Sequence, residues 1–153
     1  MTKGSRVLLG LAWKLSLATA ALALFMAIRS ALYETGVDYQ QGALFRLLYI
    51  HVPAAWFSLL LLITLATAQL VYSTTGARWL LKVLGVSLAI GLPCTVIVLA
   101  TGLYWGRLIW GGVVYLDPRI VAQIFVLALY LVYALLRITK VYTLYVSATT
   151  WAA

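Results

Sequence analysis

The sequence predicts an all-α membrane protein: a polytopic bundle of about four transmembrane helices, with an interfacial loop between the third and the fourth. Hydrophobic residues make up 65% of the 153 residues and charged residues only 9%, which excludes an ordinary soluble domain. The apolar residues form four runs of about the twenty residues that an α-helix needs to cross a bilayer. We expect a single membrane domain, 1–153, with spans at about 7–28, 52–72, 83–104 and 120–136.

The first run is long for a secretion signal, and no convincing small-residue cleavage site precedes Arg29. We therefore expect it to stay in the membrane as an anchor. None of the runs shows the ten-residue alternation of a transmembrane β-strand, so helices are expected throughout.

The second run begins beside the only histidine, His51, and residues 47–77 contain no charged side chain. Pro53 lacks a backbone N–H and suits the first turn of a helix, so we expect the helix to start near Val52. His51 is then expected at the water–lipid boundary, where an imidazole can meet a metal or a metal-bearing molecule.

The third run contains Gly85, Gly91 and Pro93. These residues are expected to loosen the helix, and close helix packing by small side chains is a better explanation for them than a transport hinge. Cys94 is the only cysteine, so no internal disulfide forms, and it is expected to be a packing residue.

Between the third and fourth runs lies an apolar, aromatic and glycine-rich segment, 105–119, that is too short and broken to cross the bilayer. We expect it to lie flat at the interface, with Trp105, Trp110 and Tyr115 at headgroup depth. An aromatic belt without a ligand explains the same residues.

The fourth run is preceded by Asp117 and Pro118, which predict the N-cap and the first residue of a helix. This structural role leaves no need for a catalytic one at Asp117. No role is assigned to the mildly apolar residues 138–153.

Charge predicts the topology. With four spans, both termini and the 73–82 connection share one side. The lysines and arginines outside the expected spans divide six to four between the two sides, which favours the side with six as cytoplasmic or matrix. His51 and the 105–119 loop are then on the outer side, towards the periplasm or the intermembrane space. The inner set is Lys3, Arg6, Arg78, Lys82, Arg137 and Lys140; the outer set is Arg29, Arg46, Arg107 and Arg119, with all three acids. The dispersed charges give no nucleic-acid patch.

One outward histidine and an outward aromatic segment describe a resting place for a flat, apolar, metal-bearing molecule such as haem. Imidazole is a common axial ligand of haem iron, which makes His51 the candidate metal ligand. Arg46, Arg107 and Arg119 are expected on the same side, where arginine suits the two propionates. No nucleophile–base pair or carboxylate dyad is present, so we do not expect an enzyme.

Two strings resemble the haem-handling protein C family of cytochrome c maturation, and the resemblance covers about 38–136. The first resembles the family's first external loop and second span, and the second resembles its tryptophan-rich loop. They read Asp38-Tyr39-Gln40-Gln41-Gly42, Arg46 and Tyr49-Ile50-His51-Val52-Pro53-Ala54-Ala55-Trp56, then Thr101-Gly102, Trp105-Gly106, Trp110-Gly111, Asp117 and Arg119.

The resemblance implies that haem at the outer face is held by axial histidines, one of them at the position of His51, with the tryptophan-rich loop as a platform. It also implies handover to a membrane-tethered haem chaperone, with help from an ABC-type transporter complex, in the inner membrane of bacteria or mitochondria.

This chain departs from the family pattern in three ways. The family carries about six spans and a second external histidine, whereas four runs and one histidine are found here, and Val113, Val114 and Leu116 stand where the family loop is rich in tryptophan. Three interpretations follow: one part of a split protein, a reduced haem handler that takes its second ligand from a partner, or a haem-free structural accessory subunit of a larger respiratory or assembly complex. Our leading hypothesis is haem binding and handover in cytochrome c biogenesis.

Overall fold

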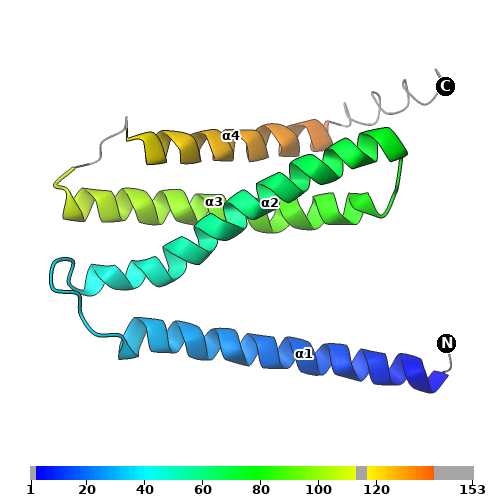
Figure 1. Cartoon of the computed structure of the whole chain (residues 1–153), viewed down its shortest axis with the longest axis horizontal. Helices are drawn as coiled ribbons and strands as arrows, with labels where there is room; N and C mark the ends of the chain where they lie inside the picture. The colour runs from blue at the N-terminus through cyan, green and yellow to red at the C-terminus, as the bar shows by residue number, and fades with distance from the viewer. Residues whose placement is uncertain (1–2, 113–116, 140–153) are drawn as a thin grey trace. The chain divides into compact units, whose positions relative to one another are not determined.

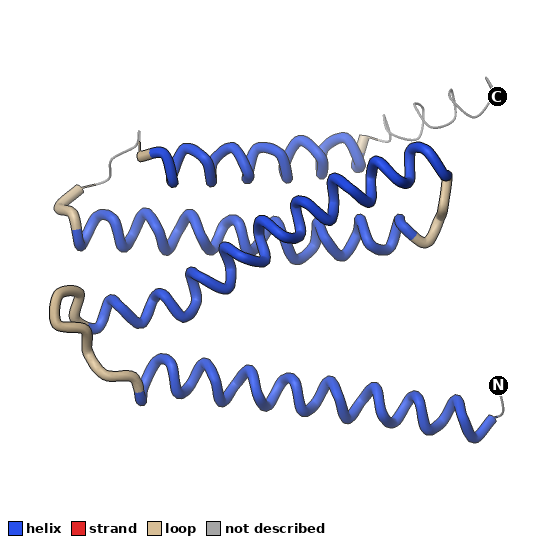
Figure 2. Tube along the Cα trace, viewed as in Figure 1, coloured by secondary structure: helices blue, strands red, loops and turns tan. Residues whose placement is uncertain are grey.

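The computed structural model describes residues 3–112 and 117–139. These residues are almost entirely helical, and four of the helices are long and apolar enough to cross a membrane (Figures 1 and 2). The all-α polytopic prediction is therefore confirmed. The helices are α1 (Lys3–Arg29), α2 (Leu48–Thr75), α3 (Leu80–Ile109) and α4 (Pro118–Ile138).

Contacts divide the chain into two compact units, Met1–Tyr49 and Ile50–Ala153, and each is described by itself. In the first unit, α1 continues into a π-helical turn, η1 (Ser30–Glu34), where Arg29 and Glu34 form an exposed ion pair of 2.5 Å. No side chain in the apolar stretch of α1 is buried, as suits a helix whose surroundings are lipid or other apolar helices.

A tight turn in the first unit explains the string that starts at Asp38. The Asp38 carboxylate accepts the backbone N–H groups of Gln40 (2.9 Å) and Gln41 (2.7 Å), and the Asp38 carbonyl accepts the N–H of Gly42 (2.9 Å). Gly42 has a φ of 60°, a left-handed conformation that favours glycine. The carboxylate is thus used to close the turn that leads into a short 3₁₀ helix, η2 (Ala43–Leu47).

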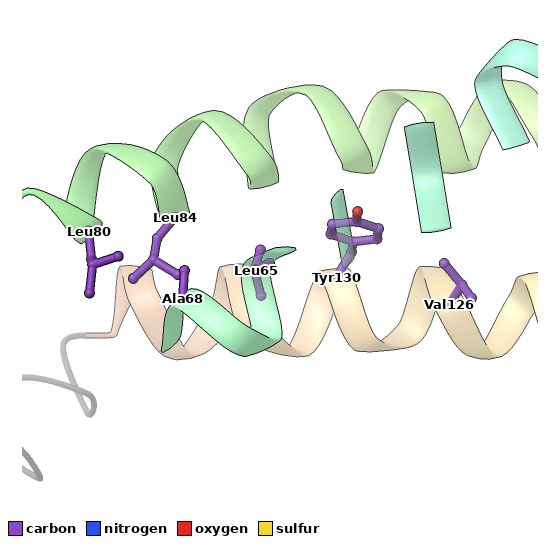
Figure 3. Close-up of a cluster of buried hydrophobic side chains, with 6 residues drawn as sticks. All are labelled: Leu65, Ala68, Leu80, Leu84, Val126 and Tyr130. Carbon is purple, nitrogen blue, oxygen red and sulfur yellow. The ribbon is translucent and has the colours of Figure 1, made fainter. Parts of the chain in front are cut away.

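The second unit contains the core. The short 76–79 connection reverses the chain, so that α2 and α3 run in opposite directions and α2 crosses α3 obliquely, whereas α3 packs along α4 (Figure 1). Apolar side chains from all three helices meet in one cluster (Figure 3), which consists of Leu65, Ala68, Leu80, Leu84, Val126 and Tyr130.

Buried polar groups in this unit bond to one another, as a membrane interior requires. The hydroxyls of Ser58 and Thr95 lie 2.7 Å apart, Thr95 also donates to the Gly91 carbonyl (2.9 Å), and Tyr130 donates to the Ser58 carbonyl (2.8 Å). A Cβ atom on Gly91 would lie 2.1 Å from the Tyr130 hydroxyl oxygen. The close-packing interpretation is therefore confirmed at Gly91.

The expected start of the second helix was wrong. It begins at Leu48, so His51 lies inside the helix and Pro53 is its sixth residue. A proline there removes the hydrogen bond to the Tyr49 carbonyl and its ring crowds that carbonyl. The helix continues through it because an apolar sequence in a membrane must bond its own backbone groups.

The boundary between the third helix and the following loop was also misplaced. The third helix continues to Ile109, so Trp105 and Arg107 lie on a helix and not in an interfacial loop. Gly106 is buried within this last part, and a Cβ atom there would lie 3.4 Å from the Trp110 ring. Glycine is tolerated because an aromatic ring packs over it, an interaction that composition alone does not show.

Candidate functional site

His51 on α2 lies against the C-terminal part of α3. Its Nδ1 atom is 2.8 Å from the hydroxyl oxygen of Thr101, which is itself 2.6 Å from the Ile97 carbonyl oxygen. The Cε1 atom of the imidazole would lie 3.3 Å from a Cβ atom on Gly102. The ring is half-buried. One edge lies against α3, where it contacts the Thr101 hydroxyl and the backbone at Gly102.

Trp105 lies one turn further along α3, on the same face. Its ring is edge-to-face with the imidazole, with centroids 6.3 Å apart and planes at 82°, a favourable aromatic geometry. The indole Nε1 is buried and has no hydrogen-bond partner in the described part of the chain. A buried donor of this kind calls for an acceptor, and the described residues do not supply one.

Asp117 caps α4, as the sequence predicted. Its carboxylate accepts a hydrogen bond from the backbone N–H of Arg119 (2.9 Å). It also accepts a bidentate pair from the Arg119 guanidinium, Nε to Oδ1 at 3.0 Å and Nη2 to Oδ2 at 2.6 Å. These bonds lower the pKa of the Asp117 carboxyl to about 2, the side-chain hydrogen bond being the largest cause and the backbone bond the next. The carboxylate therefore stays charged over nearly the whole pH range.

Arg119 also lies over Trp110, with its Cζ atom 4.9 Å from the ring centroid. Trp110 is 59% exposed, and the Arg119 side chain is 72% exposed. These two predicted site residues thus form a second cluster with Asp117, at the end of the unit that also holds the start of α4. A carboxylate ligand at Arg119 would have to compete with Asp117.

The remaining predicted residues are placed separately. Arg46 belongs to the first unit, where its Nη2 donates to the Thr35 carbonyl (2.9 Å) and its Nε is buried without a partner among the described residues. Arg107 is exposed on α3, and Tyr115 lies outside the described residues.

Sequence reasoning missed Thr101 and Gly102 as neighbours of His51. Both precede Trp105 by three or four residues, a spacing that places residues on one face of a helix. This spacing could have indicated that they lie beside His51 together with Trp105. It becomes useful only once the helix is known to run through Trp105, because residues of a loop have no such common face.

Comparison with known proteins adds the family. The profile of the family described as heme exporter protein C matches residues 4–143. A ccmC-like mitochondrial protein of Marchantia polymorpha is 31% identical over 127 residues, 83% of this chain and 52% of that protein. Heme exporter protein C of Escherichia coli K12 is 36% identical over 97 residues, 61% of this chain and 38% of that protein.

A ccmC-like mitochondrial protein of Arabidopsis thaliana is 34% identical over 106 residues, 69% of this chain and 41% of that protein. The chain thus spans about half the length, or less, of these curated relatives. No solved structure matches it. The family profile covers nearly the whole sequence, and on that ground the chain belongs to the heme exporter protein C family.

Proposed function

We propose that this chain binds haem through His51 at the outer face of a bacterial or mitochondrial inner membrane, and hands it on during cytochrome c biogenesis. Family membership supports the haem-handling role. The observation that carries the assignment to His51 is its position: the only imidazole of the chain is half-buried near the end of a membrane helix, beside an indole with an unused donor.

The residues present fit haem better than a bare metal ion. No group of three or more histidine, cysteine, aspartate or glutamate side chains that could hold a metal occurs in the described part of the chain. A single imidazole suffices where the metal arrives with its own ligands, as haem iron does with four ring nitrogens. The unpartnered Nε1–H of Trp105 suits a carboxylate acceptor, and haem carries two propionates.

Haem has an iron, an apolar ring and two charged propionates, and different side chains would contact each part. His51 would bind the iron, and Trp105, Trp110 and Tyr115 would line the ring. Among the arginines, Arg107 is exposed and available for a propionate, whereas Arg119 would exchange its Asp117 partner for one. Arg46 bonds the Thr35 carbonyl within the first unit.

Binding and release require no bond-making chemistry, so we propose a carrier and not an enzyme. The outer orientation rests on the six-to-four division of basic residues between the two sides. The proposed partners are a membrane-tethered haem chaperone and the ABC-type transporter subunits of the maturation system. Unburied apolar side chains on the helices suit contact with lipid and with the helices of such partners.

The test is a haem titration of the full chain in lipid nanodiscs, followed by the Soret absorbance. His51→Ala should weaken haem binding by more than the roughly 10–100-fold that loss of an outer-shell partner costs. Val52→Ala is the matched control, because Val52 is the neighbouring residue and is 43% exposed. If His51→Ala and the unmodified chain titrate alike, the carrier proposal is wrong and the haem-free accessory subunit becomes the better description.

A further inference from the structure

The hydroxyl of Thr101 lies between the imidazole of His51 and the carbonyls of its own helix. A threonine hydroxyl has one proton to donate and two lone pairs to accept with. The Ile97 carbonyl oxygen lies 2.6 Å away and the Val98 carbonyl oxygen 3.3 Å away, and both can only accept. Two oxygens 2.6 Å apart need a proton between them, so the Thr101 proton is committed to its own helix.

The imidazole must then be the donor in its contact with Thr101. Its Nδ1 lies 2.8 Å from the Thr101 oxygen, and with the hydroxyl proton committed elsewhere only an Nδ1–H makes this contact attractive. A neutral imidazole protonated at Nδ1 has a bare lone pair at Nε2. Because metals bind imidazole through an unprotonated nitrogen, Nε2 becomes the available ligand atom.

We propose that Thr101 is a positioning residue that holds His51 in the Nδ1–H tautomer and so presents Nε2 to haem iron. The role of Thr101 towards haem rests on the proposed function, whereas the tautomer of His51 does not. Neighbouring residues fix the ring further: Gly102 leaves room for the Cε1 edge, and Trp105 lies edge-on to the imidazole at 6.3 Å between centroids.

Hydrogen bonding at the remote nitrogen also tunes the ligand. An acceptor at Nδ1–H makes imidazole a more basic donor at the other nitrogen, which favours the oxidised metal and strengthens the bond to iron. The choice of a neutral hydroxyl, rather than a carboxylate, makes this effect moderate. A moderate iron–imidazole bond is what a carrier needs, because its cargo has to leave again.

The first experiment needs no haem. The chain has one histidine, so ¹⁵N-histidine labelling gives signals from His51 alone. Solid-state NMR of the full chain in bilayers at pH 8, where imidazole is neutral, should show a protonated Nδ1 and a bare Nε2. Thr101→Val keeps the side-chain shape and removes the acceptor, and it should populate the Nε2–H tautomer. Thr101→Ser keeps the hydroxyl and should restore the original signals.

Thr67→Val is the matched control, because among the described residues the Thr67 hydroxyl bonds carbonyls of its own helix alone, at Ile63 (2.9 Å) and Thr64 (3.1 Å). It should leave the His51 signals unchanged. A protonated Nε2 in the unmodified chain, or signals that Thr101→Val does not alter, would overturn the proposal.

The second experiment adds haem to the same samples. Thr101→Val should weaken haem binding by roughly 10–100-fold and raise the reduction potential of the bound haem, and Thr101→Ser should reverse both changes. Unchanged affinity and potential in Thr101→Val would overturn the tuning role of Thr101 while leaving the carrier function intact. If the expected tautomer is found but the unmodified chain binds no haem, the proposed function fails while the assignment of Thr101 as the residue that sets the tautomer is supported.

Discussion

Gly91 is the position where a single added methyl group should do the most damage to the second unit. In Gly91→Ala the new Cβ atom would lie 2.1 Å from the Tyr130 Oη, 2.5 Å from Cζ and 2.8 Å from Cε1. Real Cβ contacts are essentially never below 3.0 Å. The Tyr130 ring is rigid, fully buried and hydrogen-bonded to the Ser58 carbonyl, so it cannot move aside without breaking that bond.

The expected loss of stability is the sum of three contributions, of which two are unfavourable and one is favourable. Overpacking a buried site costs about 1–3 kcal/mol, and losing one interhelical hydrogen bond in a membrane about 0.6 kcal/mol. Alanine is favoured over glycine inside a helix by about 1 kcal/mol, which offsets part of this. Because the clash is with a rigid ring at close range, the overpacking cost falls in its upper range, and we expect a net loss of roughly 1.5–2.5 kcal/mol.

The assay is unfolding of the chain in mixed micelles by increasing denaturing detergent, followed by tryptophan fluorescence and circular dichroism. Gly85→Ala is the matched control on the same helix, because its nearest atoms would be the Arg137 guanidinium nitrogens at 3.6 and 3.7 Å. It should be neutral or stabilising by up to about 1 kcal/mol. Unfolding of both variants at the same detergent concentration, or a higher stability of Gly91→Ala, would show that Tyr130 does not clash with a Cβ atom at position 91.

Two further predictions concern the polar end of the second unit. In Gly102→Ala, the new Cβ atom would lie 3.3 Å from the His51 Cε1 atom. It should displace the imidazole by a few tenths of an ångström and weaken its contact with Thr101, which changes the ¹⁵N spectrum of His51. An unchanged spectrum would contradict the tight fit at Gly102. Asp117 has a pKa lowered from 3.8 to about 2, so its cap on α4 contributes fully above pH 3.8 and is lost as the pH falls towards 2. Thermal unfolding between pH 5 and 2 should show this loss, and Asp117→Ala should be less stable at pH 5 and lack this part of the pH dependence.

The helices could be predicted from the sequence because their cause is local. Twenty apolar residues in a row must bond their own backbone groups when lipid surrounds them, whatever the rest of the chain does. The cap at Asp117 is equally local, since the acceptor and the first N–H groups are neighbours in the chain. The start of α2 and the end of α3 could not be placed, because whether a helix continues through Pro53 or Gly106 depends on what surrounds these residues and not on the two residues alone.

The candidate site was only partly predictable. His51 was expected near a membrane boundary with Trp105 close by, and the structure brings these two residues together. The separation of Trp110 and Arg119 into a second cluster was not foreseen, because the contact of Arg119 with Trp110 depends on the direction in which α4 begins. Their roles towards haem stay predictions.

The sequence by itself determined that this is a helical membrane protein with one imidazole near the end of a span, because apolar length and residue type act without reference to distant partners. Only the tertiary structure decided which groups meet across helices: Thr101 with His51, and Tyr130 in the space left by Gly91. These pairs lie 50 and 39 residues apart in the chain. Their meeting depends on the rotation and register of packed helices, which are set by the fit of many side chains at once.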